Sequence, residues 1–216
     1  MAVPYSALLI ADDVSDEAER DFGFDITEAN TLKVVESIIQ EVTGILEGAS
    51  GLGRNLIVRA YTHYFQYRDW RWDEARDLYY VMAPQWPVVE IDTSGFTSGA
   101  SSDSFQNEAD MILNASRFSG VVTYYAGYKR PEQTLVGLQA ESGLSAMGTL
   151  PSDLPYDLRN VALNAVLNNL AARRFGPGQR AVTMNPAVQT TTIQEPILDY
   201  VSQLVRERVY HHRKFI

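Results

Sequence analysis

The residue patterns that could carry chemistry are few, and each fits a structural role better. Gly51 and Gly53 in GLG form half of a dinucleotide-binding fingerprint, but the third glycine is missing and the motif follows a predicted helix instead of a strand. GFTSG at 95–99 resembles a nucleophile elbow, but its serine stands fourth instead of third. We therefore interpret GLG as a helix C-cap and GFTSG as part of a loop.

Metal-binding patterns are equally weak. The acidic run that begins at Asp12 lacks the regular alternation and the glycine of a calcium loop. His211 and His212 are adjacent, so on a helix they point about 100° apart and cannot chelate one ion together. His63 stands among tyrosines and is interpreted as a packed or surface residue. The sequence therefore predicts no catalytic, cofactor-binding or metal-binding residue.

Composition limits the classes of protein. The chain has 216 residues, 45% hydrophobic and 21% charged, which is ordinary for a soluble globular protein. It has no cysteine, which excludes a disulfide scaffold, a thiolate zinc site and a cysteine nucleophile, and fits a reducing compartment. No apolar run reaches the roughly 18 residues of a membrane span, and YSALLIA near the N-terminus lacks the basic flank of a signal peptide. The net charge of −9 argues against tight nucleic-acid binding through a broad basic surface.

Charge is unevenly distributed along the chain. Residues 12–28 hold many acids against one basic residue, Arg20, whereas residues 206–214 are basic. One interpretation is two solvated ends. The other is that both ends dock on oppositely charged surfaces of partners.

Hydrophobic periodicity predicts three helices, over residues 25–46, 150–175 and 195–213. Residues 57–67 form either a strand or an aromatic-faced segment, and residues 71–84 are compatible with a helical turn or a strand. Residues 86–92, 109–115 and 120–128 are expected to be strands of a small antiparallel sheet. Hairpins are the expected connections, including one through the turn SRFSG, and residues 93–104 are expected to be a Gly/Ser loop.

These elements predict an α+β fold, specifically a mostly helical bundle with a small antiparallel β-sheet. We expect an acidic N-terminal extension over residues 1–25 and a single domain over residues 26–216 that ends in a docking helix.

Three motifs, in this order, carry a family resemblance. They are the early helix ITEANTLKVVESIIQEVTGIL, the strand VVTYYAGY, and the helix entry LPSDLPYDLRNVALNAVLNNLAARR. The chain from about residue 26 to residue 175 thereby resembles the head–tail adaptor (head–tail connector, gp6-like) family of tailed bacteriophages. The stretch before residue 25 and the long segments 93–104 and 176–196 depart from that pattern.

The resemblance implies structural work in a virion without catalysis or a cofactor. Such adaptors form a ring, usually of twelve copies, under the portal protein, extend the DNA channel and present a surface to stopper or tail proteins. It implies a location in the virion's head–tail connector, and in the host cytoplasm during assembly, with no membrane and no specific DNA contact. Two alternatives stay open: a stopper or tail-completion protein, and a small enzyme or sugar-binding module.

Two groups of residues are expected to make contacts. Tyr124, Tyr125 and Tyr128 are predicted to be subunit packing residues. Since strand side chains alternate, Tyr124 and Tyr125 face opposite sides, so one is expected to be buried and the other to lie at a subunit contact or under a helix. The C-terminal helix is predicted to dock on the portal, unless it packs on the chain's own helix over 157–174. Its docking residues form an apolar face and a basic end: Ile197, Val201, Leu204, Val205, Arg206, Arg208, Arg213 and Lys214.

Overall fold

The structure is a computed structural model that describes residues 6–22, 29–48, 52–92, 101–103 and 111–175. The chain divides into two compact units. The helical unit contains the described residues up to Arg54 and those from Leu154 onward. The sheet unit contains the described residues between Asn55 and Asp153.

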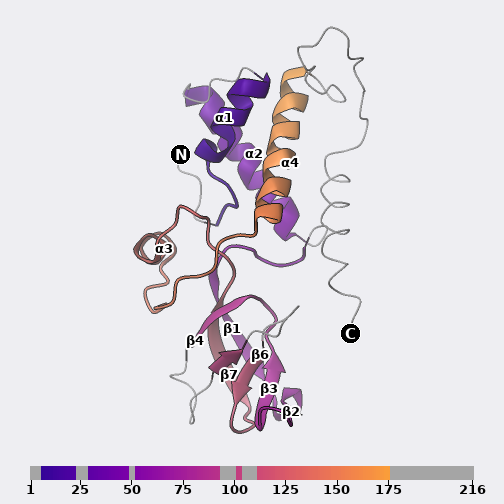
Figure 1. The fold of residues 1–216 in the computed structure, drawn as a ribbon, viewed down its shortest axis with the longest axis vertical. Coiled ribbons are helices and arrows are strands. Elements are labelled where there is room, and N and C mark those ends of the chain that lie inside the picture. Colours follow the sequence, from indigo (N-terminus) through magenta and orange to yellow (C-terminus); the bar gives the residue numbers. More distant parts are fainter. Residues whose placement is uncertain (1–5, 23–28, 49–51, 93–100, 104–110, 176–216) are drawn as a thin grey trace. The chain divides into compact units, whose positions relative to one another are not determined.

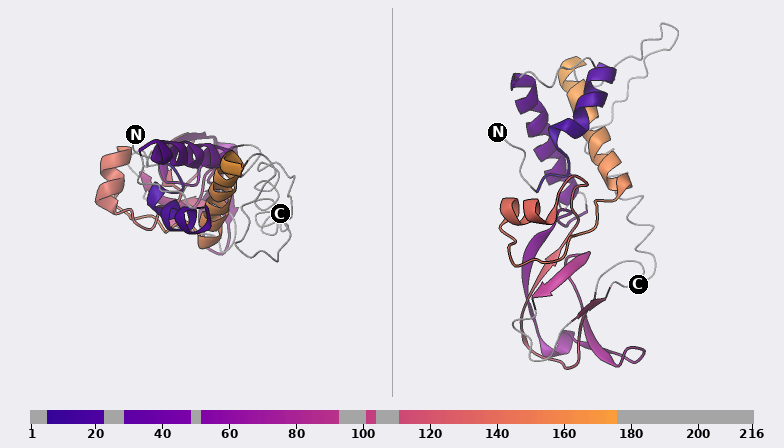
Figure 2. Two further views of the ribbon diagram at one scale, coloured as in Figure 1. Left: turned by 90° about the horizontal axis from the view of Figure 1, so that it is seen from above. Right: turned by 60° about the vertical axis from the view of Figure 1, so that its left-hand side comes forward.

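Three helices build the helical unit: α1 (Ala11–Phe22), α2 (Ala29–Glu47) and α4 (Tyr156–Phe175). They lie side by side, and each packs against the other two (Figures 1 and 2). The buried positions of α2 recur at three- and four-residue steps, which confirms the amphipathic helix that the sequence predicts there. The expected start at residue 25 lies outside the described residues. The apolar stripe of α4 is buried as well, at Val161, Ala162, Ala165, Val166 and Leu170.

The N-terminal stretch contributes to the core of the helical unit. Leu8 and Leu9, just before α1, are both 1% exposed. The Leu8 N–H donates to Thr43 Oγ1 of α2 at 3.2 Å. Asp13 of α1 forms an ion pair with Arg159 of α4 and accepts the Ile10 N–H at 2.9 Å. The boundary expected at residue 25 stays a prediction, but part of the acidic charge in this stretch is used inside the chain.

The sheet unit holds two antiparallel sheets. The three-stranded sheet has the order β1-β7-β4, from Arg59–Phe65, Gly120–Ala126 and Val88–Asp92. The four-stranded sheet has the order β2-β3-β6-β5, and its strands are Arg71–Asp73, Leu78–Met82, Met111–Asn114 and Ser101–Asp103. A short 3₁₀ helix, Tyr67–Asp69, precedes β2, and α3 (Leu135–Ser142) follows β7.

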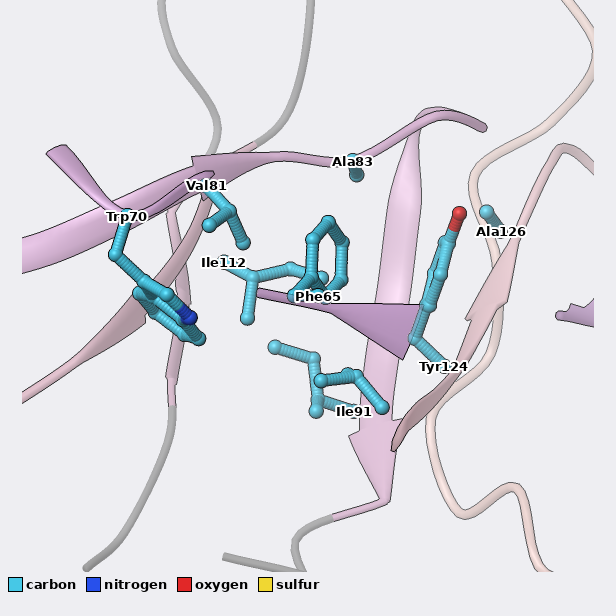
Figure 3. Packing of buried hydrophobic residues seen from close by; sticks show 9 residues of the cluster. Phe65, Trp70, Val81, Ala83, Ile91, Ile112, Tyr124 and Ala126 are labelled. Atoms are coloured by element: carbon cyan, nitrogen blue, oxygen red, sulfur yellow. The ribbon is translucent and has the colours of Figure 1, made fainter. Parts of the chain in front are cut away.

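The core of the sheet unit lies between these two sheets, because its members come from strands of both. In Figure 3 the rings of Trp70 and Tyr124 flank Phe65 and the aliphatic side chains. The buried cluster comprises Phe65, Trp70, Val81, Ala83, Ile91, Ile112, Val122, Tyr124 and Ala126.

The prediction of a mostly helical bundle with one small sheet is wrong. The fold is α+β, with two sheets that together form a unit of their own. The ambiguous residues 71–84 form β2 and β3, which pair as a hairpin. Three residues of the expected Gly/Ser loop, Ser101–Asp103, form edge strand β5, and most of that loop lies outside the described residues.

The predicted hairpin between residues 109–115 and 120–128 is also wrong. Strand β6 pairs with β3 and β5, whereas β7 pairs with β1 and β4. Strand β7 is apolar on both faces near its C-terminal end, which suits a central strand of one sheet. The turn therefore carries the chain from one sheet to the other.

Candidate interaction surface

The two adjacent tyrosines of β7 are buried on opposite faces of the strand. Tyr124 is 1% exposed and belongs to the core between the sheets. Its hydroxyl accepts the backbone N–H of Gln85 at 3.2 Å. Burial raises the pKa of the Tyr124 hydroxyl above its usual value, because the ionised form loses hydration. Tyr124 therefore packs on the inner face of the three-stranded sheet.

Tyr125 lies on the other, outer face and is 6% exposed. Leu138 of α3 and Leu144 and Met147, from the chain that follows α3, cover it. Burial raises the pKa of the Tyr125 hydroxyl, and the negative charges of Asp92 and Glu90 raise it further. This cover makes Tyr125 a packing residue within the chain.

Glu90 of β4 holds this cover on the sheet. Its carboxylate Oε2 accepts the backbone N–H groups of Gly148 and Thr149 at 2.8 and 2.9 Å. These partners lie 58 and 59 residues further along the chain. One charged side chain thereby fixes where the segment after α3 crosses the outer face.

Gly127 explains why the aromatic strand ends abruptly. Its φ is +124°, a conformation that side chains of L-residues rarely adopt. A Cβ there would lie 2.7 Å from both the Cα and the N of Val58, a contact with backbone that cannot rotate away. The Gly127 N–H donates to the Pro87 carbonyl at 2.8 Å. The chain thus turns where two neighbouring segments leave no room for a side chain.

A backbone hydrogen bond and two ion pairs hold the residues after the turn in place. Tyr128 is half-buried, and its N–H donates to the Leu56 carbonyl at 2.7 Å. Lys129 is buried, and its side chain forms an ion pair with Asp153. The backbones of the same two residues form an isolated parallel β-bridge. Arg130, also buried, contacts the Glu132 carboxylate at 2.5 Å. Sequence reasoning missed these pairs, because KRPE reads as an ordinary polar loop.

Toward the N-terminal end of β7 the same outer face has large exposed side chains. Val121 is 54% exposed and stands opposite Tyr64 of β1, which is 56% exposed. The Tyr64 hydroxyl hydrogen-bonds with Ser119 Oγ at 2.8 Å. The next pair, Thr62 and Thr123, has its hydroxyl oxygens 3.4 Å apart. The outer face is therefore closed over Tyr125 and open over Val121.

A second group of side chains lies on the four-stranded sheet, where the partly buried Tyr79 packs against the core. Trp72 of β2 stands opposite Tyr79 of β3, with ring centroids 4.7 Å apart, and is 45% exposed. The Arg117 guanidinium lies over the Tyr79 ring, 5.3 Å from its centroid. Residues 117–121 lead in sequence from Arg117 to Val121 on the open face. We call the two groups together, Tyr64 and Val121 on one sheet and the row Trp72, Tyr79 and Arg117, the aromatic surface.

The composition of the aromatic surface is that of a contact site. Tryptophan, tyrosine and arginine are the residues that most often dominate the binding energy of protein interfaces. Exposed apolar side chains that lie next to each other also mark interaction sites more often than isolated ones do. The sequence hinted at this, because aromatic residues make up 11% of the chain. Alternation alone could not tell which of them lack a cover.

Other predicted sites have simple outcomes. The eight predicted portal-docking residues between Ile197 and Lys214, the adjacent histidines and GFTSG lie outside the described residues. His63 is an exposed residue of β1 whose ring lies 4.6 Å from that of Phe65. Gly53, six residues after the end of α2, has φ +66°, and its N–H donates to the Gly48 carbonyl. Gly51, the other glycine of the predicted C-cap, lies outside the described residues.

Neither a metal-binding cluster nor a membrane-spanning helix is found in the part of the chain that the structure describes. No group of three or more histidine, aspartate or glutamate side chains in this part of the chain is placed to hold a metal ion. Among the helices described, none is long and apolar enough to cross a membrane.

Comparison with known proteins adds no relative: no protein-family model, no curated protein and no solved structure matches this chain. The resemblance to head–tail adaptors therefore rests on its motif residues alone.

Proposed function

We propose that the chain is a structural virion protein, a head-to-tail adaptor that forms a ring under the portal, extends the DNA channel and links capsid to tail. The observation that supports it best is the aromatic surface beside the strand that carries the family resemblance. Residues 124–127, at the end of β7 and in the turn after it, build the fold. The exposed positions of β1 and β7, Tyr64 and Val121, are left for contact with another molecule.

A ring imposes a requirement that such a surface meets. Copies related by rotation touch through two different surfaces, so each copy must offer one contact patch on each side. An exposed patch of aromatic and arginine side chains suits one of these contacts. A net charge of −9 suits a wall along which DNA slides, because like charge does not hold phosphate.

The portal contact in this proposal is the C-terminal segment. Its apolar positions, including Ile197 and Val201, suit a groove on a partner, and its basic end suits acidic side chains. The alternative is that the segment packs on α4 of its own chain.

The test is to mix the purified chain with the portal protein of the same phage and to examine the product by electron microscopy and light scattering. An adaptor adds a ring of its own to the portal. A stopper or tail-completion protein leaves the bare portal unchanged and binds only after an adaptor is present. An enzyme or sugar-binding module leaves the portal unchanged and turns over or binds a small substrate.

A further inference from the structure

The aromatic surface combines a rigid apolar row with positive charge. Arg117 lies over Tyr79, and Tyr79 meets the edge of Trp72, so all three side chains are held before any partner arrives. Side chains that are ordered in advance lose less conformational entropy on binding. Trp72 and Arg117 are exposed, and they are of the two residue types that most often anchor protein interfaces.

Exposed arginines near Trp72 offer a partner's carboxylates single points of contact, without making the β2–β3 segment positive as a whole. Arg68 and Arg71 are exposed in the same stretch of chain as Trp72. The carboxylate of Asp69 accepts the Gln66 N–H at 2.7 Å, and that of Asp73 is paired with Arg76 at 2.6 Å. Two of the nearby acids therefore have partners within the chain.

The chain itself carries a matching acidic surface on α1. The sequence of α1, ADDVSDEAERDF, has six acidic residues and one basic residue. Asp12 and Glu19 are exposed and lie seven residues apart, two helical turns, so they share one face. Val14 and Ala18 are buried on the opposite side. Asp12 and Glu19 are thus presented outward.

We infer that the outer face of α1 in a second copy covers the Trp72–Tyr79–Arg117 row, with the Arg117 guanidinium among the α1 carboxylates. This inference rests on the proposed function, because it names the two unlike patches that meet in the contact repeated around a ring of identical copies. The contact joins unlike surfaces, so it leaves each copy free to bind a further one and is compatible with a closed ring.

A nucleic acid fits the row less well. Aromatic rings with arginine also bind single strands, but those sites lie in grooves that are positive along the backbone path. Here the β2–β3 segment, residues 71–78, has two arginines against three acids. With a net charge of −9, the whole chain repels phosphate.

The experiment measures association of the full-length chain by sedimentation velocity, alone and with the portal, over a range of salt concentrations. Arg117→Glu and Trp72→Ala are each expected to weaken association about tenfold or more. Lys33→Glu on α2, an exposed site, changes charge by the same amount and is the matched control. Circular dichroism melts establish that every variant is folded.

A charge swap makes the test specific. Glu19→Arg is expected to weaken association as Arg117→Glu does, and the double variant is expected to recover part of the loss. Rising salt weakens the wild-type contact, because charges exposed at its rim are screened over about 10 Å at 0.1 M. Glu141→Arg, at an exposed site on α3, makes the same charge change as Glu19→Arg away from the proposed contact and is its matched control.

Each contrary outcome has a distinct meaning. If Arg117→Glu joins portal rings as well as the wild type, the inference is overturned while the adaptor function stands. If the wild-type chain stays monomeric alone and with portal, both are overturned. If single-stranded oligonucleotides bind the wild-type monomer but not the Trp72→Ala variant, the row is a nucleic-acid surface and the inference is again overturned.

Discussion

The two ends of one sheet face differ in what covers them. Over Tyr125 the outer face of the three-stranded sheet is closed by α3 and the residues after it, and that tyrosine is 6% exposed. Four residues earlier on the same strand and the same face, Val121 is 54% exposed, beside Tyr64 at 56%. Strand β7 pairs regularly with β1 at both ends, whereas β4 pairs only with residues 123–126 of β7. The difference therefore comes from β4 and from the segment that follows α3.

This contrast shows that the fold closes one end of the face with its own chain and leaves the other end exposed. The closed end depends on a turn at Gly127, on apolar contacts of Tyr125 and on the Glu90 carboxylate. The open end depends on none of these. Substitutions at the closed end should therefore change stability, and substitutions at the open end should change association.

The largest effect on the closed end is expected from Gly127→Ala. The new Cβ meets the Val58 backbone at 2.7 Å in a conformation with φ +124°, so strain and collision add. We expect a loss of about 4 kcal/mol in the free energy of unfolding, measured by urea denaturation. Gly53→Ala is the control, because φ is +66° there but a Cβ meets nothing within 4 Å. Equal losses at the two positions would show that the collision at Gly127 is absent.

Tyr125→Ala compares directly with Tyr64→Ala. Removing the buried ring leaves a cavity under α3, and we expect a loss of about 3 kcal/mol in the free energy of unfolding. Removing the exposed Tyr64 ring is expected to cost within about 0.5 kcal/mol, as for most surface substitutions. Thermal melts of the two variants measure the difference. Similar melting temperatures would remove the distinction between the two ends.

A smaller effect is expected from Glu90→Gln, because glutamine keeps one acceptor oxygen but loses the charge that strengthens both hydrogen bonds. We expect about 1 kcal/mol less stability and faster hydrogen exchange at the amides of Gly148 and Thr149. Glu141→Gln on the exposed side of α3 is the control. Unchanged exchange at both amides would contradict the role given to Glu90.

The smallest effect appears only in alkali. Because the pKa values of Tyr124 and Tyr125 are both raised, the folded chain keeps protons that the unfolded chain releases near pH 10. Their contribution to stability is therefore complete below about pH 10 and falls as the pH rises above it. Tyr125→Phe should reduce this alkaline loss, as followed by tyrosinate absorbance and denaturation. An identical pH profile in the variant would count against burial of the hydroxyl.

The sequence predicted the elements better than their partners. The periodic apolar residues of α2 and α4 and the β-branched runs of β4 and β7 identified those segments correctly. The aromatic run over residues 57–67 left two possibilities open, and the structure has strand β1 there. Strand pairing was misassigned, since β7 pairs with β1 about 60 residues away instead of with its neighbour β6. Pairing over such distances is decided by packing of the whole unit, which local propensity does not contain.

The candidate site was only partly predictable. Alternation along β7 placed Tyr124 and Tyr125 on opposite faces, as the structure has them. It did not reveal that α3 covers one of them or that Glu90 holds that cover from 58 residues away. The exposure of Tyr64 and Trp72 could not be predicted for the same reason, because a side chain stays exposed only when no distant segment of the chain lies over it.

The central claim, that the open end of the outer face is a contact surface between copies, has a direct test in cysteine protection. The chain has no cysteine, so Val121→Cys introduces a unique thiol at the open end. Val136→Cys, on α3 at a position 75% exposed, provides the comparison. We expect maleimide to label both thiols rapidly in the free chain, and to label Cys at 121 much more slowly than Cys at 136 once the chain has assembled on the portal. Equal labelling of position 121 in free and assembled chains would contradict the claim.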